Sequence, residues 1–253
     1  MIDITKLCST LLLTLSLTGG IFVAGDTSLP TPAVARSVTE NTANRVYTRA
    51  NPAVVTVRSN NGHGSGFIVS ADGYVITNAH VVRGAPAVVT VMMADGKTEM
   101  PADVVGFATG GVDLALLKVN RRGKLPTVKL ASFKSIRVGD NVYAIGTPLD
   151  ESNQNSFTSG MISAIRPDKL RIQHNAAINQ GNSGGPLLNE NGEVVGVNTA
   201  GAVTYGTDRD GQPVTRNAGN VGVNYAIDAD VVRQFISDAR QGKVSSTSTI
   251  AGY

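Results

Sequence analysis

Short apolar runs separated by turn residues make up most of the chain from Ala53 onward. Several of the breaks carry Asp-Gly or Asn-Gly pairs, which favour tight hairpin turns. Each run has the length and the β-branched content of a strand. The predicted strands are AVVTVRS (53–59), SGFIVS (65–70), GYVITN (73–78), AVVTVMM (87–93), ADVVGFA (102–108), VDLALLKV (112–119), PTVKL (126–130), NVYAIG (141–146), FTSGMISAI (157–165), KLRIQ (169–173), EVVGVNTA (193–200) and NVGVNYAI (220–227). About a dozen strands at this spacing predict an all-β fold, a sandwich or a barrel.

One amphipathic helix is predicted near the end of the chain. Its apolar stripe consists of Val231, Val232, Phe235 and Ile236. Asp228 can cap the first turn, and the helix should stop near Gly242 after packing against the β core. We therefore expect one domain over 46–240, with a linker at 36–45 and a flexible C-terminal tail at 241–253.

The first 35 residues have the organisation of an export signal. Lys6 precedes the apolar run Leu7–Gly25, and a polar stretch then leads to Ala33-Val34-Ala35, a small-x-small cleavage site. This pattern predicts a signal peptide at 1–35 and an exported protein, periplasmic or extracellular. The alternative is an uncleaved membrane anchor, because the apolar run is close to the shortest length that spans a bilayer.

Composition excludes several classes of function. The 253 residues carry a formal net charge of +3, and the short run Arg121–Lys124 is typical of a solvated turn rather than of a nucleic-acid-binding stripe. The single cysteine, Cys8, lies inside the predicted signal peptide. The mature chain therefore offers no disulfide and no thiol nucleophile, and the histidines are too scattered for a zinc-hydrolase motif. We predict no metal and no cofactor.

The segment QGNSGGPLL (180–188) places Ser183 among three glycines. A serine hydroxyl is a poor nucleophile unless a base takes its proton and a third group orients that base. The chain has three candidate bases, His63, His80 and His174. His63 lies in a Gly-rich segment and is expected on a flexible surface loop, and His174 is expected to be a solvated strand-end residue. His80 follows the apolar strand GYVITN and precedes Val81-Val82, so its ring would emerge from a rigid element.

The order of these residues along the chain restricts the fold. GNSGG also matches the nucleophile elbow of α/β-hydrolases, but that fold needs a histidine after the serine, and none follows Ser183. The subtilisin order needs a parallel α/β sheet, whereas this pattern is antiparallel. The remaining order is His, Asp, Ser on two β-barrels. Asp113 opens an apolar strand and would be costly to bury unpaired, while Asp103 stays a rival on composition alone.

Three ordered motifs resemble the trypsin-like serine proteases of the HtrA/Deg family. They are TNAHVV (77–82), GVDLALLKV (111–119) and AAINQGNSGGPLLNENGEVVGVNTA (176–200). Similarity also extends through SGFIVSADGYVITNAHVV (65–82), SIRVGDNVYAIGTP (135–148) and FTSGMISAI (157–165), and so through almost all of 46–240. The resemblance implies a trypsin-like double β-barrel with a C-terminal helix and a serine endopeptidase that needs no metal.

The resemblance also assigns roles to individual residues. It implies a triad of His80, Asp113 and Ser183, and an oxyanion hole formed by Gly181, Asn182 and Ser183. The implied substrate-binding residues are Ile178, which lines the primary pocket, and Val197, Asn198, Thr199 and Ala200, which form its wall. The implied partners are polypeptides, unfolded or misfolded proteins among them, with no nucleic acid and with a homotrimer as a further expectation.

The chain departs from the family pattern in three places. Members commonly carry PDZ domains after the protease domain, and only about a dozen residues follow the predicted domain here. His174-Asn175 stands where the family commonly has an acidic residue before AAIN, and 205–220 reads as a longer polar loop. Two alternatives remain: a catalytically silent homologue that serves as a binding module, and a secreted protease specific for acidic residues. The second would need a cationic or histidine-bearing pocket, which Ile178 does not supply.

Overall fold

The structure is a computed structural model that describes residues 38–60, 62–166, 171–201, 203–207, 213–217 and 221–249. The predicted signal peptide, and the membrane anchor that is its alternative, lie outside these residues. Within the part of the chain that is described, no helix combines the length and the apolar character needed to cross a membrane.

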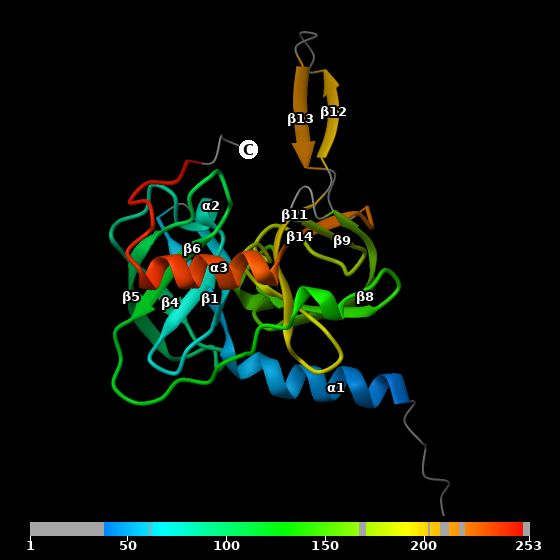
Figure 1. Ribbon diagram of the computed structural model, residues 1–253, viewed down its shortest axis with the longest axis horizontal. Coiled ribbons are helices and arrows are strands. Elements are labelled where there is room, and N and C mark those ends of the chain that lie inside the picture. Colours follow the sequence, from blue (N-terminus) through cyan, green and yellow to red (C-terminus); the bar gives the residue numbers. More distant parts are fainter. Residues whose placement is uncertain are drawn as a thin grey trace, which may run out of the picture. The chain divides into compact units, whose positions relative to one another are not determined.

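Two closed six-stranded barrels form the body of the protein (Figure 1). The N-terminal barrel consists of β1 (Val54–Ser59), β2 (Gly62–Ile68), β3 (Tyr74–Thr77), β4 (Val88–Met92), β5 (Glu99–Phe107) and β6 (Ala115–Val119). The C-terminal barrel consists of β7 (Asn141–Gly146), β8 (Ser156–Arg166), β9 (Arg171–His174), β10 (Pro186–Leu188), β11 (Val194–Gly201) and β14 (Asn224–Asp228). The predicted double β-barrel is confirmed.

Both barrels have the same strand order. The first closes as β1-β2-β3-β6-β5-β4 and the second as β7-β8-β9-β14-β11-β10, with every pairing antiparallel. In each barrel the third strand therefore pairs with the sixth, which brings distant parts of the chain to one barrel end. Closure also removes the sheet edges that would otherwise stay unpaired.

Side chains alternate between barrel interior and surface along the strands, as a period of two requires. The C-terminal barrel is filled by its own cluster of buried residues, which includes Ile162, Ile172, Ile178, Leu187 and Ala226. A larger cluster fills the N-terminal barrel and continues across to Tyr143, Leu188 and Val194 of the second barrel. This shared apolar contact fixes the two barrels against each other.

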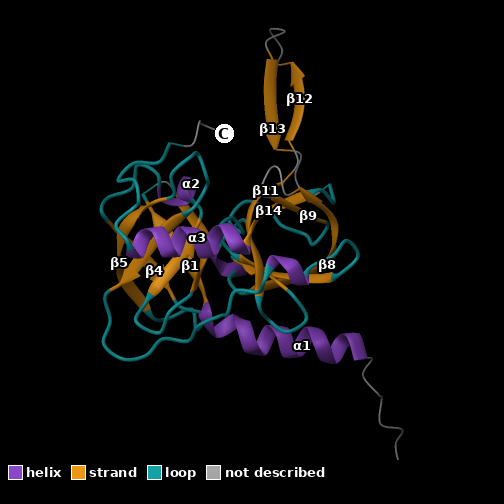
Figure 2. Cartoon of the chain, viewed as in Figure 1, coloured by secondary structure: helices purple, strands orange, loops and turns teal. Residues whose placement is uncertain are grey.

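Helices and short connections complete the fold (Figure 2). They are α1 (Val38–Ala50), η1 (Asn51–Ala53), α2 (Ala79–Val82), η2 (Phe133–Ser135), η3 (Glu151–Asn153) and α3 (Ala229–Arg240). The predicted C-terminal helix is α3: Asp228 caps it by accepting a hydrogen bond from the Asp230 amide, and Val232 and Phe235 are buried. The first part of the segment expected to be a flexible tail is bound to the N-terminal barrel, because Ser245 exchanges two backbone hydrogen bonds with Phe107 of β5.

Three segments differ from the sequence-based expectation. The stretch expected as a linker, 36–45, is helical from Val38, and α1 buries Val46 and Ala50 completely. The expected strand 126–130 is an extended connection that makes only an isolated bridge at Leu130. The expected polar loop 205–220 contains parts of a hairpin, β12 (Val203–Thr207) and β13 (Pro213–Asn217), which forms a separate two-stranded sheet.

Candidate active site

Strand pairing brings His80 and Asp113 to the same end of the N-terminal barrel. β3 and β6 are antiparallel, with Thr77 opposite Ala115. His80 follows the end of β3 in the short helix α2, and Asp113 lies two residues before the start of β6. The two side chains meet for this reason, although 33 positions separate them in the sequence.

Asp113 is nearly buried and accepts hydrogen bonds on both carboxylate oxygens. His80 Nδ1 lies 2.7 Å from Oδ2, and the His80 backbone amide donates to Oδ1 at 3.0 Å. The Thr199 hydroxyl also donates to Oδ2, at 2.8 Å. Asn78 holds the Asp113 backbone through a 2.7 Å bond to its carbonyl oxygen. The carboxylate is therefore fixed against the imidazole from several directions.

These contacts determine the charge of Asp113 and the tautomer of His80. Burial by itself would raise the pKa of Asp113, but the hydrogen bonds and charge of His80, together with the Thr199 hydroxyl, outweigh it and hold that pKa below its ordinary value. An ionised carboxylate only accepts hydrogen bonds. The proton between the two groups therefore belongs to His80 Nδ1, and Asp113 fixes the orientation of the ring through it.

Ser183 is positioned by the C-terminal barrel in the loop before β10. Its hydroxyl donates to the Thr199 carbonyl oxygen at 3.2 Å. Thr199 thus contacts both the serine, through its carbonyl, and Asp113, through its hydroxyl. Thr199 therefore joins Ser183 of the C-terminal barrel to the His80–Asp113 pair of the N-terminal barrel, so the structure brings the three residues together around it.

The segment before the serine has the features of an anion-binding loop. Gly181 has φ +95°, and a Cβ atom there would lie 2.2 Å from the Thr147 carbonyl oxygen, so only glycine fits. Within the described residues, neither the Gly181 amide nor the Ser183 amide has a protein acceptor. Asn182 is nearly buried, and its backbone amide donates to the Asn179 carbonyl oxygen at 3.0 Å.

The expected substrate-binding residues lie in and beside the C-terminal barrel. Ile178 is 5% exposed and belongs to the barrel core, and Val197 is fully buried. Asn198 uses its backbone amide and carbonyl to bond Gly185 and Gly184. The pairing of β11 with β10 ends at Val197, while its pairing with β14 continues to Gly201, so Thr199 and Ala200 lie on a stretch paired with a strand on one side only.

The other candidates of the sequence analysis lie elsewhere than expected. His174 is completely buried at the end of β9, so the expectation of a solvated residue is wrong. His63 is not on a loop but in β2, where its Nε2 lies 3.0 Å from the Thr147 carbonyl oxygen. Asp103, the rival acid, is exposed on β5 and accepts a hydrogen bond from Asn120.

Ser65 is a site residue that sequence reasoning missed. Its amide donates to the Ser183 carbonyl oxygen at 2.8 Å, and its hydroxyl donates to the Gly181 carbonyl oxygen at 2.7 Å. The Thr147 amide donates in turn to the Ser65 hydroxyl at 3.0 Å. Ser65 therefore holds both ends of the nucleophile loop from the opposite barrel. Its position at the start of SGFIVS gave no sign of this, because Ser65 and Gly181 are 116 positions apart in the sequence.

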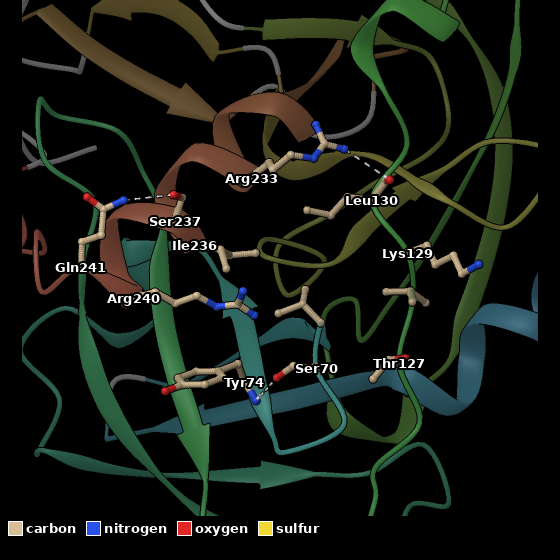
Figure 3. A pocket seen from close by; sticks show the side chains of 12 residues that line it. Ser70, Tyr74, Thr127, Lys129, Leu130, Arg233, Ile236, Ser237, Arg240 and Gln241 are labelled. Carbon is tan, nitrogen blue, oxygen red and sulfur yellow. Dashed lines mark hydrogen bonds between the residues drawn. The ribbon is translucent and has the colours of Figure 1, made fainter.

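A separate groove of about 640 Å³ lies between α3 and the segment 127–130 (Figure 3). Its lining includes apolar side chains and the cations Lys129, Arg233 and Arg240, but none of the predicted site residues. Arg233 crosses its upper edge and donates to the Leu130 and Ala131 carbonyl oxygens. The groove is thus bounded by the helix and the connection between the barrels, and its lining does not include His80, Asp113 or Ser183.

Comparisons with known proteins agree with this geometry. A family model described as a trypsin-like peptidase domain matches residues 64–197. The probable periplasmic serine endoprotease DegP-like of Halomonas elongata is 43% identical over 189 residues, which make up 72% of this chain and 36% of that protein. The putative serine protease HhoA of Synechocystis is 40% identical over 208 residues, 73% of this chain and 52% of that protein. The chain thus spans about a third to a half of the length of these relatives.

Solved structures give the same result. The HtrA-type protease AlgW with a tripeptide superposes with a TM-score of 0.67 at 32% identity, covering 80% of this chain and 64% of that one. The same protease with a decapeptide gives a TM-score of 0.65 at 29% identity, covering 79% and 68%. Because the family model covers more than half of the chain, we conclude that the chain belongs to the trypsin-like peptidase family.

Proposed function

We propose that this protein is an exported serine endopeptidase that cleaves polypeptides through an acyl-enzyme, with His80, Asp113 and Ser183 as its triad. The observation that carries the proposal is the placement of the three side chains around Thr199: its hydroxyl donates to Asp113, which holds His80 Nδ1, and its backbone carbonyl accepts from the Ser183 hydroxyl. Such an arrangement supplies a base, a group that orients it and a hydroxyl nucleophile, which acyl transfer requires.

The reaction follows from the protonation states of the site. Ser183 Oγ attacks the scissile carbonyl carbon while its proton passes to His80 Nε2. Asp113 keeps the Nδ1–H tautomer and stabilises the imidazolium that forms. The imidazolium then protonates the leaving amine, so that the acyl group stays on Ser183. A water molecule, deprotonated by His80, attacks the ester and releases the new carboxyl terminus.

The negative oxygen of the tetrahedral intermediate needs donors that are already in place. The Gly181 and Ser183 amides have no acceptor among the described residues, so they can bond this oxygen without first breaking a protein contact. Fixed backbone donors of this kind contribute about 3 kcal/mol each to transition-state stabilisation. Ser65 supports both residues by holding their carbonyl groups.

The substrates we propose are polypeptide chains, unfolded or misfolded proteins in a quality-control role. Support comes from the peptide-bound AlgW structures and from relatives named periplasmic serine endoproteases. The resemblance places Ile178 in the primary pocket, and an apolar side chain there should favour small to medium aliphatic substrate side chains such as Val, Ala or Leu. A cleavage profile over a peptide library tests this directly, and cleavage dominated by Lys, Arg or Glu would contradict it.

Ser183→Ala tests the nucleophile. The wild type should degrade casein and react with a fluorophosphonate probe, which labels activated hydroxyls, whereas Ser183→Ala should do neither. Ser132→Ala is the matched control, because this serine is exposed and remote from the triad, and it should behave as the wild type does. Equal cleavage by Ser183→Ala and the wild type would place the nucleophile elsewhere. A wild type that neither cleaves nor labels would identify the chain as a silent homologue.

A further inference from the structure

The segment from Thr147 to Asn155 connects β7 to β8 and lies beside the nucleophile loop. The Leu149 amide donates to the Gln180 carbonyl oxygen at 2.7 Å. In a trans peptide the carbonyl and the following N–H point in opposite directions. Leu149 therefore fixes the plane of the peptide bond between Gln180 and Gly181, and with it the direction of the Gly181 N–H.

Leu149 makes this bond from an unfavourable backbone conformation. Its φ is +64°, in the left-handed region that a leucine rarely adopts. Its side chain is 68% exposed, so burial of the side chain does not hold the residue in place. The neighbouring residues must therefore hold the backbone, and the contacts of the segment show how.

The segment is tightly folded on itself. Asp150 accepts a hydrogen bond from the Ser152 amide and caps the short helix η3. The Asn153 side chain donates to the Pro148 carbonyl oxygen at 3.1 Å, and the Asp150 amide donates to the same oxygen at 2.7 Å. Because these bonds make the segment rigid, the position of Glu151 determines the position of Leu149, two residues away.

Beyond the contacts of Thr147 at its start, the segment is docked onto the N-terminal barrel by the side chains of Glu151, Gln154 and Asn155. Arg58 on β1 donates through Nε to both carboxylate oxygens of Glu151, at 2.8 and 2.7 Å. Gln154 donates to the Met93 carbonyl oxygen at 2.9 Å, and Asn155 donates to the Ala94 carbonyl oxygen at 2.7 Å. The barrel that carries His80 and Asp113 thus also holds the segment that orients the Gly181 peptide.

β1 presents one face to this segment. Thr56 and Arg58 are two residues apart and so lie on the same side of the strand. The Thr56 and Thr147 hydroxyls are 2.6 Å apart, and Arg58 reaches Glu151 from the same face. Arg58 also pairs with Glu99 of its own barrel, with Nη1 at 2.5 Å from Oε1, which holds the guanidinium in place from the other side.

We propose that the Arg58–Glu151 ion pair is a positioning device for oxyanion binding: it docks the segment 147–155 on the N-terminal barrel so that Leu149 holds the Gly181 N–H in its productive direction. Arg58 and Glu151 do not touch the substrate and act through Leu149. The inference rests on the proposed function, because it assigns the Gly181 amide to the developing oxyanion.

Glu151→Ala removes the docking contact, and Glu99→Ala is its matched control. Both variants delete one carboxylate partner of Arg58, but only Glu151 lies on the segment that reaches Leu149. With a peptide amide substrate, Glu151→Ala should lower kcat about tenfold, less than the roughly 10²–10³ that loss of a whole oxyanion donor costs. Its KM should stay within about twofold, because ground-state binding does not use the oxyanion donors. Glu99→Ala should keep both constants within about twofold of the wild type.

A second readout does not depend on catalysis. Hydrogen exchange of the Leu149 amide reports its bond to Gln180 directly, and it can be measured on the inactive Ser183→Ala background. Exchange should accelerate in Glu151→Ala and stay slow in Glu99→Ala. This result would support the positioning role of the Arg58–Glu151 pair even if the wild type showed no Ser183-dependent cleavage. Such an absence of cleavage would overturn the proposed function instead. Three results would each overturn the positioning role of the Arg58–Glu151 pair. They are an equal loss of kcat in Glu151→Ala and Glu99→Ala, a rise in KM at constant kcat in Glu151→Ala, and unchanged exchange of the Leu149 amide in Glu151→Ala.

Discussion

Acid should destabilise this protein through one buried histidine. His174 has no exposed surface, and its side chain points into the C-terminal barrel on the same face of β9 as Ile172. Among the described residues, neither ring nitrogen is within hydrogen-bonding geometry of a partner. Burial lowers the pKa of His174 to about 4, and a polar interaction with the Asn198 side chain, too poorly aligned to be a hydrogen bond, opposes this without reversing it. The folded protein therefore holds this ring neutral.

The magnitude follows from the difference between the folded and unfolded states. The ring titrates near 6.5 in an unfolded chain and near 4 in the folded one. Each pKa unit is worth about 1.4 kcal/mol, so this group contributes about 3 kcal/mol at neutral pH that is lost as the pH falls from 6.5 to 4. Against a typical total of roughly 5–15 kcal/mol, such a loss is large.

The assay compares two proteins at two pH values. Urea unfolding of Ser183→Ala, which cannot digest itself, gives the reference free energy of unfolding at pH 7 and pH 4. His174→Leu in the same background replaces the titrating ring with an apolar side chain of similar size. Its fixed packing effect is the same at both pH values, so the difference between the proteins should shift by about 3 kcal/mol in favour of His174→Leu at pH 4.

Other titrating groups cancel in this comparison because both proteins contain them. Asp228 is the main one: burial raises its pKa to about 6, so its contribution has the opposite sign and favours the folded state as the pH falls below 6. A difference between the two proteins that stays constant from pH 7 to pH 4 would refute the argument. It would mean that water or a local rearrangement solvates the ring of His174 in the folded state.

Three further predictions concern the triad, the C-terminal helix and activation. Asp113→Asn should lower kcat by roughly 10⁴ because the amide favours the wrong His80 tautomer, whereas Asp103→Asn should leave steady-state cleavage unchanged; the reverse ranking would reassign the acid. Arg233→Ala should lose about 1–2 kcal/mol of unfolding free energy, because Arg233 donates to the Leu130 and Ala131 carbonyl oxygens. Arg240→Ala, in the same groove, should lose little. Equal urea unfolding midpoints for the two variants would contradict this. Because Asn182 carries no charge to pair with a free amino terminus, residues 36–253 should be equally active with and without an uncleaved N-terminal tag, and activity that appears only after tag removal would disprove it.

The sequence was most informative where side chains repeat with a local period. Alternating apolar residues predicted most strands of both barrels, and the stripe around Phe235 predicted α3. The same kind of signal was present but overlooked in α1, where Ala43, Val46, Tyr47 and Ala50 follow helical spacing. It was also present at His174, which alternates with Ile172 and so had to share its buried face. Both misses were errors of interpretation rather than of missing information.

Long-range contacts were a different matter, because no local pattern encodes them. The pairing of the third strand with the sixth in each barrel joins residues tens of positions apart. The contact of Ser65 with Gly181 and the ion pair of Arg58 with Glu151 join residues 116 and 93 positions apart. Motif order suggested His80, Asp113 and Ser183 only through resemblance to a family. Composition alone could not separate Asp113 from Asp103, because burial and hydrogen bonding distinguish them.

The division of the site between two barrels couples activity to the way the barrels dock. His80 and Asp113 come from the first barrel, and Ser183 and Thr199 come from the second. The hydrogen bond from Thr199 to Asp113 is part of the site and also part of the contact between the barrels. Breaking it would leave a buried carboxylate short of a donor, which costs more than an ordinary surface contact. A small displacement of one barrel against the other would break the Thr199–Asp113 bond and so would be opposed by its cost. The docked arrangement is the one in which the buried Asp113 carboxylate keeps this donor.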